Sequence, residues 1–143
     1  MNVAGILKGK GADVISARPS DTIAAVCNIL GSKRIGAVLV IGADGDILGI
    51  LSERDIVRGL AECGNECLAQ TAADWMTSSL ITVAPSETID NVMALMTQKR
   101  IRHLPVIEEG KLAGFISIGD VVKSRMDEVE REAAALRDYI ATG

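Results

Sequence analysis

The sequence contains the same ordered set of residues twice. Identical residues fall on one another at a shift of 66 positions, which becomes 65 after one residue is lost in a turn. The matched pairs include Ile15 with Ile81, Pro19 with Pro85, Ile35 with Ile101, Gly49 with Gly114, Ser52 with Ser117, and Asp55 with Asp120. Such a repeat indicates a duplicated supersecondary unit that is too small to bury its apolar face alone. We therefore expect two halves that share one folded body.

Each half is predicted to fold as a β-α-β-β-α unit. A short strand (13–17 or 80–83) ends in a Pro-Ser turn, and Ser20 or Ser86 then opens a helix. Two strands follow around a turn, which is Glu-Gly in the second half and Asp-Gly, a strong hairpin signal, in the first. The expected strands are 37–41 and 47–51 in the first half and 103–107 and 112–116 in the second, and the second helices are expected at 53–62 and from 118 onward.

The fold class that follows is α/β (α+β). We expect two such repeats packed sheet to sheet with pseudo-twofold symmetry, plus a further helix at the carboxyl end. The expected segments are a helical N-terminal stretch at 1–12, the first repeat at 13–63, a linker at 64–79, the second repeat at 80–125 and the C-terminal helix at 126–143. The linker is predicted to hold a short helical turn near 72–76.

The composition of the 143-residue chain disfavours several kinds of partner. A net charge of −4 provides no excess positive field, so nucleic acid and anionic membranes are not expected partners. One Trp, one Tyr and one Phe leave few rings on which bases could stack. The longest apolar stretch, at 35–43, has nine residues, whereas a bilayer span needs roughly 20.

The three cysteines make an odd count, and Cys63 and Cys67 form a C-x-x-x-C pair. A secreted disulfide framework is therefore disfavoured, and reduced thiols in a cytoplasmic protein are expected. We interpret Cys63 and Cys67 as inert or weakly redox-active thiols rather than as a switch. With a single His in the chain, a structural zinc site lacks ligands, and no metal is expected.

A Gly-h-h-Ser-x-x-Asp pattern, in which h is an apolar residue, leads into the second helix of each half. It ends in Ser52 and Asp55 in the first half and in Ser117 and Asp120 in the second. One interpretation is a capping box, in which the hydroxyl and the acid each satisfy a free backbone N–H group. The other is a nucleotide site, because a helix N-terminus suits a phosphate and an acid can accept hydrogen bonds from ribose hydroxyls.

The tandem arrangement, the paired Gly-h-h-Ser-x-x-Asp patterns and the stretch Arg-Ile-Arg-His-Leu-Pro-Val at 100–106 resemble a pair of cystathionine β-synthase (CBS) domains. The resemblance covers about residues 13–125 and is to stand-alone bacterial and archaeal CBS pairs, or Bateman modules. It implies that AMP, ATP or ADP, or else NAD or S-adenosylmethionine, binds in clefts between the halves. It also implies a homodimer shaped as a flat disc.

Carried over by position, the resemblance implies that Ser52 and Ser117 contact phosphate and that Asp55 and Asp120 hold ribose. The further residues that it assigns to binding in the first half are Ser16, Ala17, Arg18, Gly36, Ala37 and Arg54. Those in the second half are Thr82, Val83, Ala84, Arg102, His103 and Pro105. Because the basic residues differ between the halves, the two clefts are not expected to be equivalent.

His103 has two interpretations. A lone His at a strand edge is commonly a structural residue, whereas the resemblance favours a contact with a ligand phosphate. As a catalytic base it would need a partner nucleophile, and no nucleophile motif accompanies it. The chain is therefore not expected to be an enzyme, although a nucleotide hydrolase is the enzymatic alternative.

The carboxyl-terminal stretch carries a heptad-like seam. Its apolar residues, at steps of three and four, are Met126, Val129, Ala133, Leu136 and Ile140. Such a helix either lies back on its own protomer or contacts a second copy, and the dimer is favoured.

The leading hypothesis is a ligand sensor that binds an adenine nucleotide, with AMP the first candidate, and signals to a separate effector protein. A ligand can shift a conformational equilibrium only by its differential affinity for the two states. The alternatives are a structural dimerisation module with vestigial clefts, and a sensor of NAD or S-adenosylmethionine.

Overall fold

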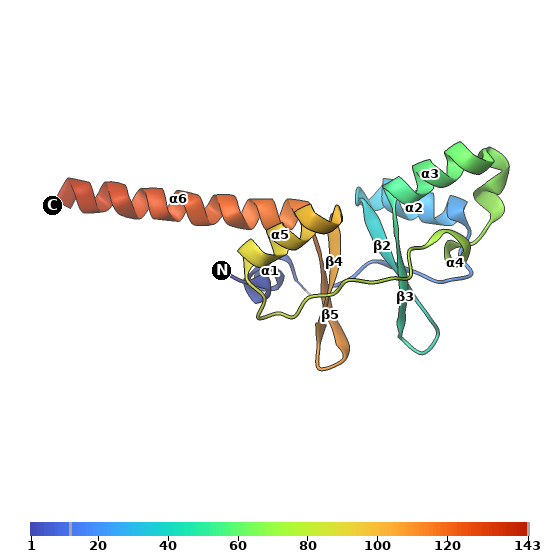
Figure 1. The fold of residues 1–143 in the computed structure, drawn as a ribbon, viewed down its shortest axis with the longest axis horizontal. Coiled ribbons are helices and arrows are strands. Elements are labelled where there is room, and N and C mark those ends of the chain that lie inside the picture. Colours follow the sequence, from blue (N-terminus) through green and yellow to red (C-terminus); the bar gives the residue numbers. More distant parts are fainter. Residues whose placement is uncertain (12, 143) are drawn as a thin grey trace. The chain divides into compact units, whose positions relative to one another are not determined.

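The computed structural model describes residues 1–11 and 13–142, and these form two compact units (Figure 1). The repeat-1 unit is Val14–Leu80, and the repeat-2 unit joins Met1–Asp13 to Ile81–Gly143. Helices and short sheets occur in both units, so the expected α+β class is confirmed. Ala12 and Gly143, which end the predicted N-terminal stretch and C-terminal helix, lie outside the described residues.

The repeat-1 unit is built on a three-stranded sheet. Its elements are β1 (Ser16–Ala17), α2 (Ile23–Lys33), β2 (Ala37–Ile41), β3 (Ile47–Ser52), α3 (Glu53–Cys63), the 3-10 helix η1 (Asn65–Ala69) and α4 (Ala72–Trp75). The strand order is β1-β2-β3, with β1 parallel and β3 antiparallel to β2. In the central strand, Val38, Leu39 and Val40 are fully buried, as its continuous apolar sequence predicts.

The repeat-2 unit repeats this hairpin and adds a long helix. Its elements are α1 (Val3–Lys10), α5 (Ile89–Lys99), β4 (His103–Glu108), β5 (Lys111–Ser117) and α6 (Ile118–Thr142). The strand expected at 80–83 is reduced to one parallel bridge between Val83 and Val106. α6 runs without interruption for 25 residues, so no structural break separates the expected second repeat from the C-terminal helix. Despite its length, neither α6 nor any other described helix is apolar enough to cross a membrane.

The first helix of each repeat begins later than the sequence predicts. α2 begins after Thr22, and α5 begins after Thr88; each threonine side chain accepts a hydrogen bond from a backbone amide one turn later. The prediction that Ser20 and Ser86 open these helices is wrong, because each serine lies in the turn before the cap. Threonine is a good N-cap, so the start of the helix moves by two residues.

The segment that precedes each repeat packs on the other repeat. Val3, at the start of α1, is fully buried in the repeat-2 core, and its amide donates to the Glu87 carbonyl at 2.9 Å. Ala72, at the start of α4, is fully buried in the repeat-1 core, and its amide donates to the Asp21 carbonyl at 2.7 Å. Asp21 and Glu87 are matched positions of the repeat, so α1 and α4 have equivalent structural roles.

Candidate nucleotide site

Ser52 and Asp55 form a capping box at the start of α3. The Asp55 amide donates to the Ser52 hydroxyl at 3.3 Å, and the Ser52 amide and hydroxyl donate to Oδ2 of Asp55 at 2.9 and 3.0 Å. The capping interpretation of the motif is therefore confirmed. Within the described chain no hydrogen bond reaches Oδ1 of Asp55, so this oxygen can accept from a ligand.

Ser117 and Asp120 repeat this arrangement at the start of α6, with one addition. The Ser117 amide and hydroxyl donate to Oδ2 of Asp120 at 2.8 and 3.1 Å, and Nζ of Lys10 donates to the same oxygen at 2.7 Å. Burial by itself would raise the pKa of the Asp120 carboxyl. The hydrogen bonds from Lys10 and Ser117, together with the Lys10 charge, outweigh burial and lower that pKa below its usual value.

The start of β2 lies beside the first capping box. Ala37 pairs with Ser52 across the β2–β3 hairpin, and the Glu53 amide donates to the Gly36 carbonyl at 2.9 Å. Together with the capping box, these bonds bring together four of the residues that the resemblance assigns to the first-half site: Gly36, Ala37, Ser52 and Asp55. Arg54 follows directly in α3 and is exposed.

The start of β4 has the same position in the repeat-2 unit. His103 pairs with Ser117, and the amide of Ile118 donates to the Arg102 carbonyl at 2.8 Å. The His103 ring also stacks on Phe115, with ring centroids 5.7 Å apart. This stacking gives His103 a structural contact, and its contact with a ligand stays a prediction.

The residues expected from the first strand of each repeat lie away from the capping box of their own unit. Ser16 and Ala17 pair with the middle of β2, and Arg18 follows toward the far end of that strand. At about 3.3 Å per residue, Arg18 lies roughly 13 Å beyond the level of Ala37. The matched residues in the repeat-2 unit, which take the same course past β4, are Thr82, Val83 and Ala84. Pro105 is buried within β4. The ligand contacts assigned to these residues stay predictions.

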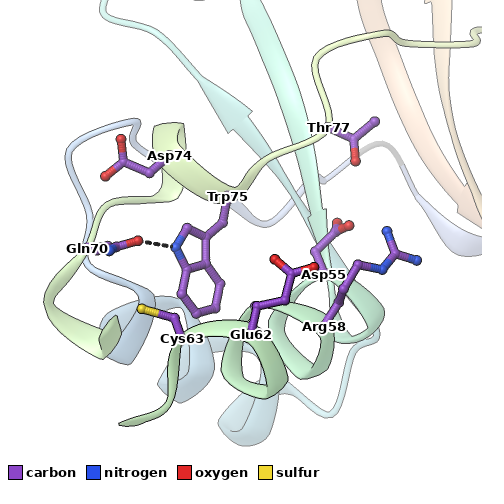
Figure 2. A pocket seen from close by; sticks show the side chains of 9 residues that line it. Asp55, Arg58, Glu62, Cys63, Gln70, Asp74, Trp75 and Thr77 are labelled. Carbon is purple, nitrogen blue, oxygen red and sulfur yellow. Dashed lines mark hydrogen bonds between the residues drawn. The ribbon is translucent and has the colours of Figure 1, made fainter. Parts of the chain in front are cut away.

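A cavity of about 370 Å³, which we call the Trp75 cavity, opens beside Asp55 in the repeat-1 unit (Figure 2). The residues that line it include Asp55, Arg58, Gly59, Glu62, Trp75 and Thr77. The Trp75 indole N–H donates to Oε1 of Gln70 at 2.6 Å, and the ring lies so close to Gly59 that a Cβ there would overlap it. The cavity therefore combines a flat apolar wall with carboxylates and a guanidinium.

The sequence profile of the CBS domain matches this chain twice, at residues 11–62 and 72–127. The chain belongs to the CBS domain family. It is 35% identical over 142 residues to the CBS domain-containing protein CBSX3, mitochondrial, of Arabidopsis thaliana, which covers 95% of this chain and 69% of that protein. The solved CBS-domain containing protein ATU1752 from Agrobacterium tumefaciens is 44% identical, with a TM-score of 0.85 over 87% of this chain and 92% of the other.

A more distant structure shows the same fold with adenosine compounds bound. The CBS domain pair of protein MJ0100 was solved in complex with 5′-methylthioadenosine and S-adenosyl-L-methionine. It has a TM-score of 0.78 over 90% of this chain and 98% of the other, and its 23% identity shows likeness of fold alone. The present chain is thus a CBS pair, a regulatory type of module. Its second CBS match begins at residue 72 and includes α4, which packs on the repeat-1 unit.

Cys63 and Cys67 are joined in a disulfide, with their Cα atoms 6.0 Å apart. α3 ends at Cys63, and η1 returns the chain so that Cys67 comes within the separation that disulfides require. The expectation of reduced thiols is wrong for this pair, because the turn at Gly64 brings Cys67 back to Cys63. The expected cytoplasmic location rested partly on reduced thiols and loses that support.

Two residues of this CBS pair were missed by the sequence reasoning. Lys10 lies outside the repeat, and it is 110 positions from Asp120 in the sequence, so no local sequence pattern predicts their contact. Trp75 was within reach of prediction, because Thr71 and Asp74 form a capping box just before it. Among the described residues no group of three or more His, Cys, Asp or Glu is placed to hold a metal ion.

Proposed function

We propose that this CBS pair binds an adenosine nucleotide, AMP before the others, at the start of α3. The observation that carries the proposal is the Asp55 carboxylate, fixed by Ser52 through one oxygen and placed at the Trp75 cavity (Figure 2). The volume of about 370 Å³ lies within the range of small-molecule sites, about 300–1,000 Å³. The adenosine compounds bound to the MJ0100 pair favour the same ligand class.

The chemistry of the site assigns a part of the nucleotide to each group. The first amides of α3 offer N–H donors and the positive end of the helix dipole to a phosphate, and Arg54 adds a charge in the first turn. Oδ1 of Asp55 accepts from the ribose hydroxyls. The Trp75 indole gives the base an apolar wall.

The expected affinity is moderate. AMP has about 23 non-hydrogen atoms, and roughly 0.3 kcal/mol per atom gives about −7 kcal/mol, or a Kd on the order of 10 μM. Such a Kd suits a sensor whose occupancy follows the concentration of a metabolite. ATP, ADP, NAD and S-adenosylmethionine share the adenosine part and are the competing ligands.

Titration calorimetry of the purified chain with AMP, ATP, ADP, NAD and S-adenosylmethionine tests the proposal. We expect saturable binding of at least one ligand and at least about tenfold weaker binding by Asp55→Asn. Asp21→Asn is the matched control, because Asp21 caps an exposed turn of the same unit and does not line the cavity. No heat and no shift of Tm with any of the five ligands would refute the function.

We propose that the output of this module is conformational and is read by a separate effector protein. A ligand that binds one arrangement of the module better than another shifts the population toward it. A module that only binds its ligand leaves it unchanged, so we expect the nucleotide to be recovered intact after incubation with Mg²⁺. Hydrolysis during that incubation would establish an enzyme instead.

A second proposal concerns self-association through α6. The carboxyl-terminal part of this helix extends beyond α1 and α5 (Figure 1). The seam side chains Met126, Val129, Leu136 and Ile140 are between 48% and 68% exposed. A heptad seam of this kind is buried when two helices pair, so we propose a homodimer with α6 at the contact.

Light scattering after size-exclusion chromatography tests the dimer. Leu136→Glu puts a charge in the seam and should convert the dimer to a monomer, whereas Ala135→Glu puts the same charge beside the seam and should leave the mass unchanged. Equal masses for the two variants would remove α6 from the contact. A dimer that binds none of the five nucleotides would instead be a structural dimerisation module.

A further inference from the structure

Lys10 forms an ion pair with Asp120, the capping-box carboxylate of the second repeat. Its ammonium donates to Oδ2 of Asp120 at 2.7 Å and to the Phe115 carbonyl at 2.8 Å. The side chains of Lys10 and Asp120 are 37% and 24% exposed, so the pair is partly shielded from water. The acid matched with Asp55 is therefore already paired within its own unit.

The packing of α1 fixes Lys10 in this place. Val3 is fully buried in the repeat-2 core, and Leu7 lies so close to Gly114 that a Cβ there would come within 2.5 Å of its methyl group. The helix ends just after Lys10, where the Gly11 amide donates to the Leu7 carbonyl at 2.7 Å. The lysine thus leaves the last turn of a helix that is anchored on the same unit as Asp120.

The repeat-1 unit satisfies the matched carbonyl in another way. The Ile50 carbonyl, which corresponds to that of Phe115, accepts from the Thr77 backbone amide at 2.8 Å. That amide is used on the carbonyl, and no hydrogen bond within the described residues joins Thr77 to Asp55. An ammonium has three hydrogens, and Lys10 donates one to the Phe115 carbonyl and another to Asp120. Among described residues, the only hydrogen-bond donors to the Asp55 carboxylate belong to Ser52.

We propose that Lys10 holds the Asp120 site closed to ribose, so that this CBS pair fills the Asp55 site first and the Asp120 site only after Lys10 has moved. The inference rests on the proposed nucleotide function and adds its regulation. It makes Lys10 the residue that sets the difference in affinity between the two domains.

The competition is between an ammonium and a sugar for one acid. Oδ2 of Asp120 already accepts from Ser117 and Lys10, whereas no hydrogen bond within the described residues reaches its Oδ1. A ribose that approaches must share the acid with the ammonium or displace it. A phosphate attracts the displaced ammonium, whereas adenosine has no phosphate. The closure should therefore weaken adenosine more than AMP.

Calorimetry in an Asp55→Asn background isolates the second site. The probes are adenosine and AMP at fixed ionic strength. Adding Lys10→Ala should tighten adenosine binding about fivefold, which corresponds to the loss of a partly exposed ion pair, and should tighten AMP binding by less. Lys8→Ala removes the same charge from the same helix and should leave both Kd values unchanged. Lys10→Arg keeps the charge and should keep the site closed. Circular dichroism and Tm confirm that each variant is folded, and Lys10→Gln replaces any variant that is not.

The outcomes separate this inference from the proposed function. If the natural chain binds AMP but Lys10→Ala leaves second-site affinity unchanged or weakens it, the inference is overturned and the function stands. If only variants without Lys10 bind, the closure stands and the natural chain is not an AMP sensor. If neither the natural chain nor any variant binds either probe, both the proposed function and the inference about Lys10 are refuted.

Discussion

The two CBS domains share a capping box and differ in what lies beside its acid. Asp55 stands at the Trp75 cavity and is bonded by Ser52, whereas Asp120 is bonded by Ser117 and also by Lys10. The difference follows from the two segments that precede one repeat and pack on the other, α1 and the α4 segment, which we call the crossed segments. α1 ends in Lys10, whereas the chain after α4 continues to Thr77, whose backbone amide bonds the matched carbonyl. The duplicated fold thus becomes unequal through α1 and the chain that follows α4, which have equivalent structural roles but present different donors.

The largest expected effect concerns the contacts that hold these crossed segments. A Cβ at Gly49 would lie 2.8 Å from the Thr77 carbonyl oxygen and equally close to the Met76 side chain, whereas the nearest atoms to one at the matched Gly114 belong to the Leu7 side chain. A backbone atom cannot rotate away, so Gly49→Ala should lower the free energy of unfolding by about 2–3 kcal/mol and Gly114→Ala by about 1 kcal/mol. Urea unfolding of both variants measures the difference, and equal losses would show that the two segments are held alike.

The disulfide should give the next largest difference between the units. It lies at the end of α3 in the repeat-1 unit, whereas α6 continues through the matched region. Reduction with dithiothreitol should cost about 2 kcal/mol for so short a loop and should change the fluorescence of Trp75, the single tryptophan of the chain. Cys27→Ser, at the remaining free thiol, should leave both signals unaltered. A fluorescence spectrum that does not change with the reductant would show that the disulfide does not affect the surroundings of Trp75.

The acid dependence of stability should depend on Lys10. The pKa of Asp120 is lowered in the folded chain. The Lys10–Asp120 pair therefore stabilises the folded chain at pH values above the pKa of an unfolded aspartate, about 3.9. That contribution is lost as the pH falls through the folded pKa. Lys10→Ala should therefore lower the free energy of unfolding at pH 7 by at most about 1 kcal/mol, since the pair is partly exposed, and the difference should vanish in acid. Thermal unfolding as a function of pH measures it, and a constant difference would contradict the pairing.

The smallest expected effect lies at the ends of α2 and α5. Arg34 and Arg100 are left-handed caps, each with φ 54°, a conformation that glycine adopts without cost. Arg34→Gly should stabilise the chain by about 0.5 kcal/mol, whereas Lys33→Gly, one residue inside the helix, should destabilise it by about 1 kcal/mol. Arg100→Gly should gain less, because Arg100 takes part in a further interaction. A loss of stability by Arg34→Gly would mean that its side chain matters more than its backbone.

The duplicated strands, helices and capping boxes could be predicted from the sequence because their signals are local. Turn residues set both hairpins, and Ser-x-x-Asp set the start of α3 and α6. The crossed packing of α1 could not be predicted, because its partners lie about 85 positions away, as in the bond from Val3 to Glu87. The disulfide was missed for another reason, since closure of the loop between Cys63 and Cys67 depends on the geometry of η1.

The unequal domains are tested most directly by comparing one conservative change at the two matched acids. Calorimetric titration of AMP into Asp55→Asn and Asp120→Asn measures the contribution of each acid to the tighter binding event. If the Asp55 site is open and the Asp120 site is closed by Lys10, Asp55→Asn should weaken that event at least about tenfold and Asp120→Asn less than about twofold. An equal loss in both variants, or a larger loss in Asp120→Asn, would contradict the assignment.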